Sequence, residues 1–468
     1  MRLPLQRQAA TAAFLLLVSS TMADVPHWTD AESYNAGALG DAPNQTFRSS
    51  PGIMAPIFQV TKLDISQLDS APYLFLDWHY DHAGAPMIFR ADDLSLVYAD
   101  QWCPHVKNTR VQELGGERFL TFWEGADFWG YGRGGCLFFD EGYNLRYNIT
   151  PIGDQFELLT DLHECQVTEE GTVLIAIYDP IPFDLSPIGG PVDGTLLDGV
   201  FQEIDPKTNS LNYLVSSASF NHAILINGTD GSTIWTLGGE DNDFQFLHGD
   251  PGFAMPHQPR LLKSEDNSNH VTLFDNQVER VNAVGCTANC SRGIHVKLDH
   301  EKKTAEVVRE FFHPMSLKSL AQGGFTSLKG GNVLVAWGTQ PGVTEHKANG
   351  EVVMDIQFGR IGNEYHPEWN AAYRVFKGHW KGQPAWDPSI AVEDGTVYVS
   401  WNGATEVAGW IVFGSDHADK IHGSTTILAK SPRRGFETVI PLSHVPRYLR
   451  AAATDSKGRV LGYTAAWD

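Results

Sequence analysis

A short phrase that recurs along the chain constrains the fold more than any other feature of the sequence. Its clearest copies are GNVLVAWG at residues 331–338 and GTVYVSWNG at residues 395–403. Each combines a turn signal, an alternating apolar run and a tryptophan followed closely by glycine, and β-branched alternation after a tight turn is typical of a strand. Weaker copies occupy residues 119–125, 172–178, 271–276 and 458–463.

The copies predict an all-β fold with one sheet per repeat. They recur roughly every 50–65 residues, which is typical of the blades of a β-propeller. We therefore predict a single six-bladed β-propeller over residues 61–468, closed by its N- and C-terminal strands. Tyr73–Trp78 is the first convincing strand, and we expect it beside strands from residues 446–466, because ring closure removes exposed sheet edges. Ordinary hairpins in a β-sandwich are the alternative interpretation.

The N-terminus has the pattern of a secretory signal. Two arginines precede a short apolar run over residues 9–18, and small residues follow at 21–23. This predicts a signal peptide over residues 1–23 and an extended N-terminal arm over residues 24–60. The apolar run is too short to span a bilayer, although a retained anchor is the alternative. We expect a protein that is secreted or stays in the lumen of the secretory pathway, with no membrane contact after cleavage.

Charge excludes one class of partner. The chain has 34 Lys and Arg against 56 Asp and Glu, a formal net charge of −22. Binding to a phosphate backbone needs Lys and Arg to displace counterions, so we expect no nucleic-acid partner. The expected ligand is a small aromatic molecule, and the sequence does not indicate an oligomeric state.

Export would permit disulfides. The chain has five cysteines, at positions 103, 136, 165, 286 and 290. We predict a small loop closed by Cys286 and Cys290 and a bridge from Cys103 to Cys136, with Cys165 left as a buried thiol, although sequence alone does not fix connectivity. A zinc site is the alternative, but no second Cys pair or spaced His pair completes one, so we expect no metal.

Four Asn-x-Ser/Thr sequons fit a secreted eukaryotic protein. They begin at Asn44, Asn148, Asn227 and Asn289. The fourth sequon contains Cys290, so glycosylation there would compete with the predicted Cys286–Cys290 bridge.

Several motifs resemble the fungal branch of the arylsulfotransferase family, and they keep their order from residue 60 to the C-terminus. They are His163-Glu164, Phe201–Asp205, Trp235–Gly239, Pro256–Arg260, Leu273–Asn276, Ala336–Gly338, Thr344–His346, Tyr373–Phe376 and Val397–Val407. The resemblance implies a six-bladed propeller with a central funnel. Bacterial relatives move sulfate between phenols through a transient sulfohistidine, assisted by arginine and other histidines. Some fungal members are hetero-Diels–Alderases that couple a tropolone- or phenol-derived quinone methide to a terpene alkene.

The resemblance would place His257 and Arg280 at the funnel. An arginine is a permanent bidentate donor and a histidine can donate or accept a proton, so this pair suits an anionic oxygen. A hydrogen-bonded structural histidine and a surface arginine are the alternative. His346 is the third catalytic candidate, as a substitute nucleophile.

Six further side chains are candidates for substrate contact: Trp123, Glu124, His163, Trp337, Glu345 and Trp401. The tryptophans end copies of the repeated phrase and could form aromatic walls for a flat substrate, with packing between blades as the alternative. The carboxylates could act as acid or base if they are desolvated, with solvated turn residues as the alternative.

Two departures from the family bear on function. Residues 217–223 run directly from one strand into the next where relatives carry a further segment, which leaves the third or fourth blade short of strands. The family nucleophile would lie near residues 324–327, and no histidine is there. A sulfohistidine route needs that nucleophile.

These departures order the functional hypotheses. The first is a secreted enzyme of fungal secondary metabolism, a hetero-Diels–Alderase that needs no cofactor, with Arg280 and His257 as donors and Trp337 and Trp401 as walls. The second is nucleotide-independent aryl sulfate transfer with His346 in place of the missing nucleophile. The third is a non-catalytic propeller that binds a ligand.

Overall fold

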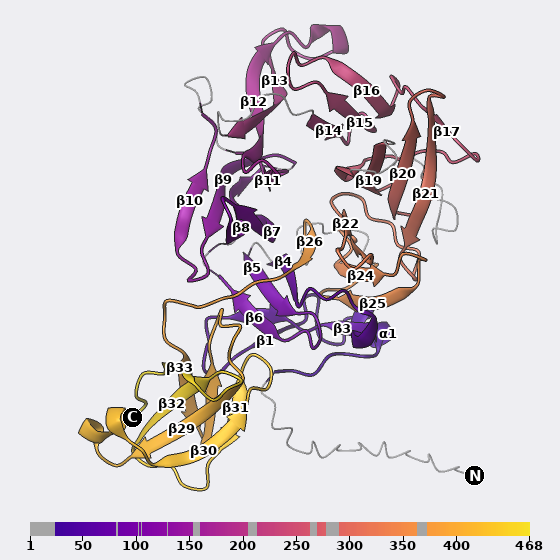
Figure 1. Ribbon diagram of the computed structural model, residues 1–468. Helices are drawn as coiled ribbons and strands as arrows, with labels where there is room; N and C mark the ends of the chain where they lie inside the picture. Colours follow the sequence, from indigo (N-terminus) through magenta and orange to yellow (C-terminus); the bar gives the residue numbers. More distant parts are fainter. Residues whose placement is uncertain are drawn as a thin grey trace, which may run out of the picture.

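The protein is all-β, as predicted, in a computed structural model that describes most of residues 24–468. The described residues exclude 81–82, 102, 104, 129, 153–159, 205–212, 263–268, 278–289 and 363–371. The predicted signal peptide therefore lies outside the described residues. Figure 1 shows a ring of sheets and a smaller unit of yellow strands beside it.

The described residues form six sheets that follow one another around the ring (Figure 1). The first two contain four strands each, in the orders β26 (Val375–Gly378), β4 (Tyr73–Tyr80), β5 (Ala83–Arg90), β6 (Leu96–Ala99) and β7 (Val106–Leu114), β8 (Glu117–Asp127), β9 (Gly132–Phe139), β10 (Leu145–Ile149). The next two contain three strands each, in the orders β11 (Cys165–Val167), β12 (Val173–Phe183), β13 (Gly194–Ile204) and β14 (Tyr213–Ser217), β15 (His222–Ile226), β16 (Thr233–Gly238).

The last two ring sheets contain five strands each. Their orders are β18 (His257–Leu262), β19 (Asn269–Asp275), β20 (Arg292–Asp299), β21 (Thr304–Phe312), β17 (Gln245–Phe246) and β22 (Gly324–Ser327), β23 (Val333–Ala336), β24 (Gly342–His346), β25 (Val352–Gln357), β3 (Gln59–Leu63). Strands β7 and β26 lie towards the middle of the ring (Figure 1). β7 contacts β26 and β11, and β18 contacts β14 and β22.

The core lies between neighbouring sheets of the ring. In β4, Leu74 and Leu76 pack in a cluster with the sheet of β22–β25, whereas Phe75 packs in a cluster with the sheet of β7–β10. Side chains alternate between the two faces of a strand, and each of these sheets is covered on both faces. This is why the central strands are apolar at consecutive positions rather than at alternate ones.

The ring closes differently from the prediction. β4 was expected beside residues 446–466, but its hydrogen-bonded neighbours are β5 and β26, with Leu76 opposite Val375. Two sheets outside the ring contain the later strands, in the orders β27 (Ser389–Glu393), β28 (Thr396–Ser400), β31 (Thr438–Pro441) and β30 (Ile427–Pro432), β29 (Gly409–Ser415), β32 (Tyr448–Thr454), β33 (Val460–Tyr463). These sheets bury an apolar cluster of their own, which includes Val399, Trp410 and Leu449, so they need no neighbour in the ring to cover them.

The predicted N-terminal arm contains short elements and connects the two parts. It holds α1 (Ala31–Asn35), β1 (Asn44–Thr46) and β2 (Met54–Pro56), and the short helices elsewhere are η1 (Ile65–Gln67), η2 (Ser186–Ile188) and η3 (Ala418–Gly423). The Asp24 carboxylate accepts hydrogen bonds from the backbone N–H groups of Phe436 and Glu437. The arm therefore contacts the C-terminal unit before it reaches the ring.

The disulfide differs from the prediction. Cys136 on β9 pairs with Cys165 on β11, with the two Cα atoms 6.2 Å apart, so the expected Cys103–Cys136 bridge is wrong. Cys103 is buried, and its thiol lies 3.7 Å from the Asp100 carboxylate. The observed pair joins β9 and β11, which belong to neighbouring sheets of the ring, so the order of the strands along the chain does not indicate it. Cys286 lies outside the described residues, so the Cys286–Cys290 bridge stays a prediction.

Three of the four sequons lie in the described part of the chain. Asn44 and Asn148 are exposed and Asn227 is partly exposed, whereas Asn289 is outside the described residues. Residues 218–221 form the turn between β14 and β15, and the sheets that contain β11–β13 and β14–β16 have three described strands each. No helix of the described residues is long and apolar enough to span a membrane.

Candidate active site

A single carboxylate near the middle of the ring receives three guanidinium groups. Glu164 Oε1 lies 3.0 Å from Arg110 Nη2, and Glu164 Oε2 lies 2.7 Å from Arg260 Nη2 and 3.2 Å from Arg374 Nη1. Arg110 is on β7, Arg260 is on β18, and Arg374 directly precedes β26. Three sheets of the ring thus contribute one cation each to this arginine cluster, which we define as Arg110, Arg260 and Arg374.

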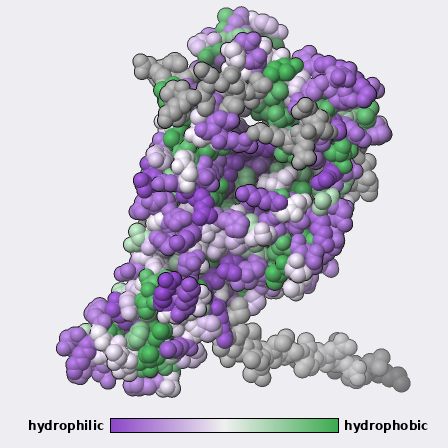
Figure 2. Space-filling model, in the orientation of Figure 1, coloured by the Kyte–Doolittle hydropathy of each residue, from purple (hydrophilic) through white to green (hydrophobic). Residues whose placement is uncertain are grey.

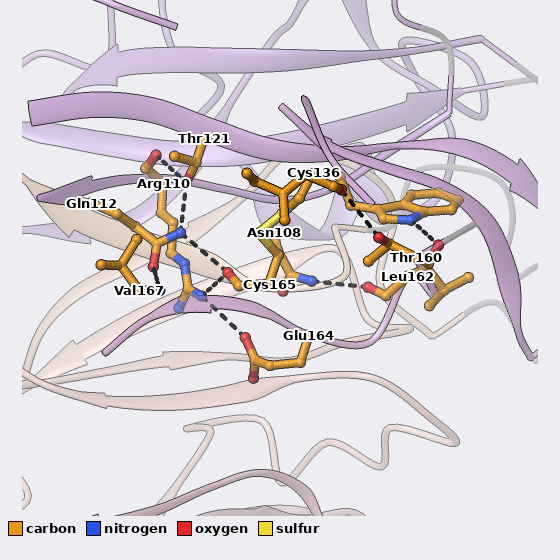
Figure 3. The surroundings of a disulfide bond; sticks show 12 residues. Asn108, Arg110, Gln112, Thr121, Cys136, Thr160, Leu162, Glu164, Cys165 and Val167 are labelled. Carbon is orange, nitrogen blue, oxygen red and sulfur yellow. Dashed lines mark hydrogen bonds and ion pairs between the residues drawn. A yellow bond between two sulfur atoms is a disulfide. The ribbon is translucent and has the colours of Figure 1, made fainter. Parts of the chain in front are cut away.

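The segment before β11 is held on both sides, which fixes Glu164. Trp123 Nε1 donates to the Thr160 carbonyl at 2.8 Å, and the side chain of Asn108 donates to the Leu162 carbonyl at 3.0 Å (Figure 3). The Cys136–Cys165 disulfide then attaches the residue after Glu164 to β9. Figure 3 shows Arg110 reaching the Glu164 carboxylate from the same side as the disulfide.

The electrostatics of the cluster follow from this crowding. Burial opposes ionisation of Glu164, but the guanidinium groups of Arg260, Arg374 and Arg110 hold the pKa of that carboxyl well below its usual range. Burial lowers the pKa of Arg110 to about 10, and the positive charges of Arg260 and Arg374 oppose the stabilising effect of Glu164. One carboxylate therefore does not neutralise the three cations. Two of the buried guanidinium Nε atoms, those of Arg110 and Arg374, have no hydrogen-bond partner in the described part of the chain.

A histidine and a buried aspartate lie beside the cluster. His163 Nδ1 lies 2.5 Å from Asp161 Oδ1, which also accepts the His163 backbone N–H at 3.0 Å. The second oxygen of Asp161 accepts the Gly132 backbone N–H at 2.6 Å. Asp161 is fully buried, whereas the His163 side chain is 34% exposed. Within the described residues His163 Nε2 has no hydrogen-bond partner, so this nitrogen is the open end of the dyad.

Tyr373 connects the dyad to the arginine cluster. Its ring centroid lies 6.1 Å from that of His163, and the Arg374 guanidinium lies 4.8 Å from the same centroid. Tyr373 is buried with Trp123 and Leu162, and burial raises the pKa of its hydroxyl to about 12. The Tyr373 ring therefore contacts both the His163 imidazole and the Arg374 guanidinium.

His257, the first catalytic candidate from sequence, lies at the N-terminal end of β18 and is hydrogen-bonded through both ring nitrogens. Nδ1 lies 2.8 Å from Asn276 Oδ1 and 3.0 Å from the Met255 carbonyl, and Nε2 accepts the Gln322 backbone N–H at 3.1 Å. Burial lowers its pKa to about 4. The ring is therefore neutral and connects three segments, which leaves no free nitrogen for substrate.

Two further catalytic candidates do not join the site. Arg280 lies outside the described residues, so its role at the funnel stays a prediction. His346 is 1% exposed on β24, with Nε2 2.7 Å from Thr344 Oγ1 and its ring against Phe311. No face of this imidazole is open to a ligand.

The tryptophans and carboxylates predicted to contact substrate are dispersed. Trp123 and Trp337 are fully buried, and Trp337 packs against Phe274 between neighbouring sheets. Trp401 lies in the C-terminal unit and donates to the Trp386 carbonyl. Glu345 is fully buried in an ion pair with Lys377. These positions fit the packing alternative for the tryptophans.

Glu124 lies outside the arginine cluster. It lines a cavity of about 570 Å³ at the end of the second ring sheet, together with Asp127, Arg133 and Asn148. Figure 2 shows one face of the molecule, where hydrophilic residues predominate around the hollowed middle of the ring.

The segment where the family nucleophile was expected adjoins the cluster without contributing a side chain. A Cβ atom on Gly324 would lie 2.1 Å from Gln258 Oε1 and 3.6 Å from Arg374 Cγ. The close approach explains the glycine, because any larger residue would displace Gln258. The imidazole of His163, from the segment before β11, contacts the ring of Tyr373, the residue before Arg374.

Comparisons with known proteins support one family. The family model described as arylsulfotransferase (ASST) matches residues 110–212 and 211–359, which is more than half of the chain. A comparison with curated proteins gives no match.

Several solved structures are similar at low identity. A protein of unknown function from Bacteroides caccae has 13% identity and a TM-score of 0.35, over 65% of this chain and 98% of its own. A putative 6-phosphogluconolactonase from Bacteroides fragilis has 12% identity and a TM-score of 0.30, over 66% and 98%. BamB from Moraxella catarrhalis has 10% identity and a TM-score of 0.24, over 84% and 98%. Scores this low carry no argument about function.

Proposed function

This chain belongs to the arylsulfotransferase (ASST) family, and from that premise we propose that it transfers sulfate between phenols without a nucleotide donor. The ring would be a six-bladed propeller with two three-stranded blades, and its middle would be the funnel. The observation that carries the proposal is the dyad of Asp161 and His163, whose Nε2 has no hydrogen-bond partner among the described residues and which directly precedes Glu164, the carboxylate of the arginine cluster.

The chemistry uses His163 as the nucleophile that the sequence lacks at residues 324–327. His163 Nε2 attacks the sulfur of an aryl sulfate, so that an N–S bond forms, the S–O bond to the aryl group breaks and the phenolate leaves. Asp161 stabilises the cationic imidazole through Nδ1–H, as a carboxylate does in a catalytic triad. An acceptor phenolate then attacks the sulfur, the N–S bond breaks and neutral His163 is restored.

The arginine cluster supports both half-reactions. The sulfuryl group carries negative charge throughout, and preorganised guanidinium groups stabilise such charge without reorganisation during the reaction. Arg260 is the most exposed of the three, with a side chain that is 26% exposed, so it is the first to meet an incoming anion. Glu164 keeps the three cations together when the funnel holds no anion.

A hetero-Diels–Alder reaction in the same funnel is the second candidate. The observation that favours it is the neutral hydroxyl of Tyr373, whose pKa is raised to about 12, on a ring that the Arg374 guanidinium covers. Such donors would polarise the oxygen of a phenol- or tropolone-derived quinone methide while a terpene alkene is held against it. This reaction needs no nucleophile, so His163 would be dispensable.

One pair of variants separates the two reactions. We would give the purified protein 4-nitrophenyl sulfate with an acceptor phenol, and separately a quinone methide precursor with a humulene-type alkene. For sulfate transfer we expect parallel double-reciprocal plots and a loss of at least roughly 10³-fold in kcat for His163→Ala, the scale seen when a nucleophile is removed. His248→Ala is the matched control, because this imidazole is 76% exposed and should keep full activity.

The outcomes discriminate clearly. Sulfate transfer that survives His163→Ala would contradict the mechanism. Stereoselective adduct formation in both the parent protein and His163→Ala would favour the cycloaddition. Saturable phenol binding with neither reaction would leave a non-catalytic binding propeller. The one observed disulfide fits an oxidising compartment, and secretion of a glycosylated chain is part of the proposal, which mass spectrometry of secreted protein would test.

A further inference from the structure

A row of aromatic rings leads away from His163. The centroid of Tyr178 on β12 lies 5.8 Å from that of His163, and the centroid of Tyr131 lies 6.3 Å from that of Tyr178. Phe128 is stacked on Tyr131, with a centroid distance of 5.5 Å. Neighbours in the row thus lie within the range in which aromatic rings interact, although they come from two different sheets.

Exposure increases along the row. Tyr373, on the inner side of His163, is 3% exposed, Tyr178 and Tyr131 are partly exposed, and Phe128 is 42% exposed. The row therefore runs from the His163 ring to solvent. A core cluster would be buried throughout, and isolated surface rings would not be in contact with each other.

The row has polar groups that its own packing does not use. Within the described residues, the hydroxyl groups of Tyr178 and Tyr131 have no hydrogen-bond partner. The first two ring contacts are edge to face, with interplanar angles of 75° and 71°, so ring faces stay available to a ligand. Rings with unoccupied faces and hydroxyls suit a ligand that is flat and carries hydroxyl groups.

Arg133 marks the outer end of the row. Its guanidinium carbon lies 5.5 Å from the centroid of Phe128, and Arg133 also lines the cavity of about 570 Å³ that contains Glu124 and Asp127. Its buried Nε has no hydrogen-bond partner among the described atoms. The outer end is therefore polar and roomy, whereas the middle of the row is aromatic.

We propose that Tyr178, Tyr131 and Phe128 form an aryl-binding lane that selects substrates with two or more linked, hydroxylated aromatic rings over single-ring phenols. The reacting phenol lies at His163, and the next ring lies against Tyr178 and Tyr131. Polar substituents of the far ring reach Arg133. The chemical identity of the reacting group rests on the proposed function, but the binding preference does not.

The test measures binding without a sulfate donor. Calorimetric titration of the full chain with phenol and with 4-phenylphenol gives the two affinities. We expect Tyr131→Ala and Phe128→Ala each to weaken 4-phenylphenol roughly 3- to 10-fold, the scale of one aromatic contact, and to change phenol by less than about twofold. Tyr178→Ala should weaken both ligands, because Tyr178 adjoins the phenol site. Phe220→Ala is the matched control, since its ring is 70% exposed and contacts His222.

Two results would overturn the lane. One is an equal loss for phenol and 4-phenylphenol in Tyr131→Ala and Phe128→Ala. The other is no loss for either ligand in variants whose melting temperature matches the parent protein. A second readout is the KM for 4-phenylphenyl sulfate, which should rise in both variants while kcat stays unchanged. Lane-dependent binding without any transfer would keep this inference and reject the proposed function, whereas transfer with the same KM in all variants would do the reverse.

Discussion

Two carboxylates of the ring are paired with cations, and the difference between them separates a structural ion pair from a site. Glu345 on β24 has Lys377 at 2.7 Å as its cation within the described residues, and both side chains are fully buried. Its other oxygen accepts from the backbone of Asp69 and the side chain of Asn332. Both carboxylate oxygens have a donor, the charges cancel, and the pair connects β24 to β26 where the ring closes.

Glu164 has the opposite surroundings. Three guanidinium groups share its one negative charge, and its side chain is 23% exposed. The residue before it in the chain is His163, whose Nε2 has no hydrogen-bond partner among the described residues. A buried ion pair contributes little to the free energy of unfolding once the cost of desolvation is subtracted. The charge balance at Glu345 therefore needs no functional explanation. The three cations that share Glu164 also have the buried Asp77 carboxylate nearby, which favours the charged form of Arg374. Arg260 of this cluster is partly exposed, so an anionic ligand can reach it.

The largest effect on stability is expected from breaking the Glu345–Lys377 ion pair. Lys377→Met leaves Glu345 as a buried charge without a cation, and we expect a loss of roughly 3–5 kcal/mol in the free energy of unfolding. The double variant Lys377→Met with Glu345→Leu should recover most of that loss, because no charge is left buried. Urea unfolding measures both. If the single variant loses less than about 1 kcal/mol, Glu345 takes up a proton or water and the pair is not sealed.

Removing the crowded carboxylate should have a smaller effect on stability that depends on anions. Glu164→Gln leaves three cations together, and we expect a loss of roughly 2–4 kcal/mol. Sodium sulfate should restore part of this stability beyond sodium chloride of equal ionic strength, because an anion can replace the carboxylate. Thermal melting in the two salts checks this, with Glu301→Gln, at an exposed position, as the control. Identical recovery in both salts would mean screening alone.

The comparison also shows what sequence could predict about the fold. The repeated phrase marks β8, β12, β19 and β23, each the second strand of its ring sheet, so those strands were predicted correctly. The copies at residues 395–403 and 458–463 lie in β28 and β33, outside the ring. Alternation of apolar residues reports a strand and its burial, but it does not specify which sheet the strand joins. Ring closure therefore had to come from the structure.

The sequence indicated the motifs that form the site, but not that they meet at one carboxylate. His163-Glu164, Pro259-Arg260 and Tyr373-Arg374 all fall in the motifs that resemble the family. Arg260 and Arg374 are 96 and 210 residues from Glu164 along the chain, so nothing local indicates that they share one carboxylate. The resemblance favoured His257, and the position of Glu345 beside a repeated phrase made it a candidate, but the polar atoms of both are occupied by their own neighbours. The informative feature is an excess of unsatisfied groups, which only tertiary packing reveals.

Removing the disulfide should affect the segment that contains Glu164 and leave the segment that contains Glu345 unchanged. Cys136 and Cys165 are 29 residues apart, and the loop-closure entropy of such a bridge corresponds to about 3.6 kcal/mol. We expect Cys136→Ser with Cys165→Ser to lose up to that amount and to increase hydrogen exchange over residues 160–167. Exchange over residues 342–346 should not change. A uniform increase across both segments would mean that the disulfide stabilises the whole ring rather than the segment that holds His163.

The smallest expected effect is a loss of stability at acidic pH. Burial lowers the pKa of His346, next to Glu345, to about 4 from an ordinary value of 6.5. The folded protein keeps this imidazole neutral while the unfolded chain takes up a proton below pH 6.5. The resulting stability is therefore complete above pH 6.5 and is lost as the pH falls towards 4, by roughly 2–3 kcal/mol for one such group.

Replacing His346 tests this pH dependence against the open histidine. His257 and His295 also have pKa values lowered to about 4, so His346→Gln should make the fall in stability between pH 6.5 and 4 shallower without abolishing it. Urea midpoints at a series of pH values measure the slope, and His248→Ala, at an exposed position, should leave it unchanged. If His163→Ala reduced the slope as much as His346→Gln does, the Asp161–His163 dyad would be closed to solvent like the Glu345–Lys377 ion pair. In that case the contrast between the two carboxylates would not extend to the histidines beside them, and the open nitrogen would lose its support as a nucleophile.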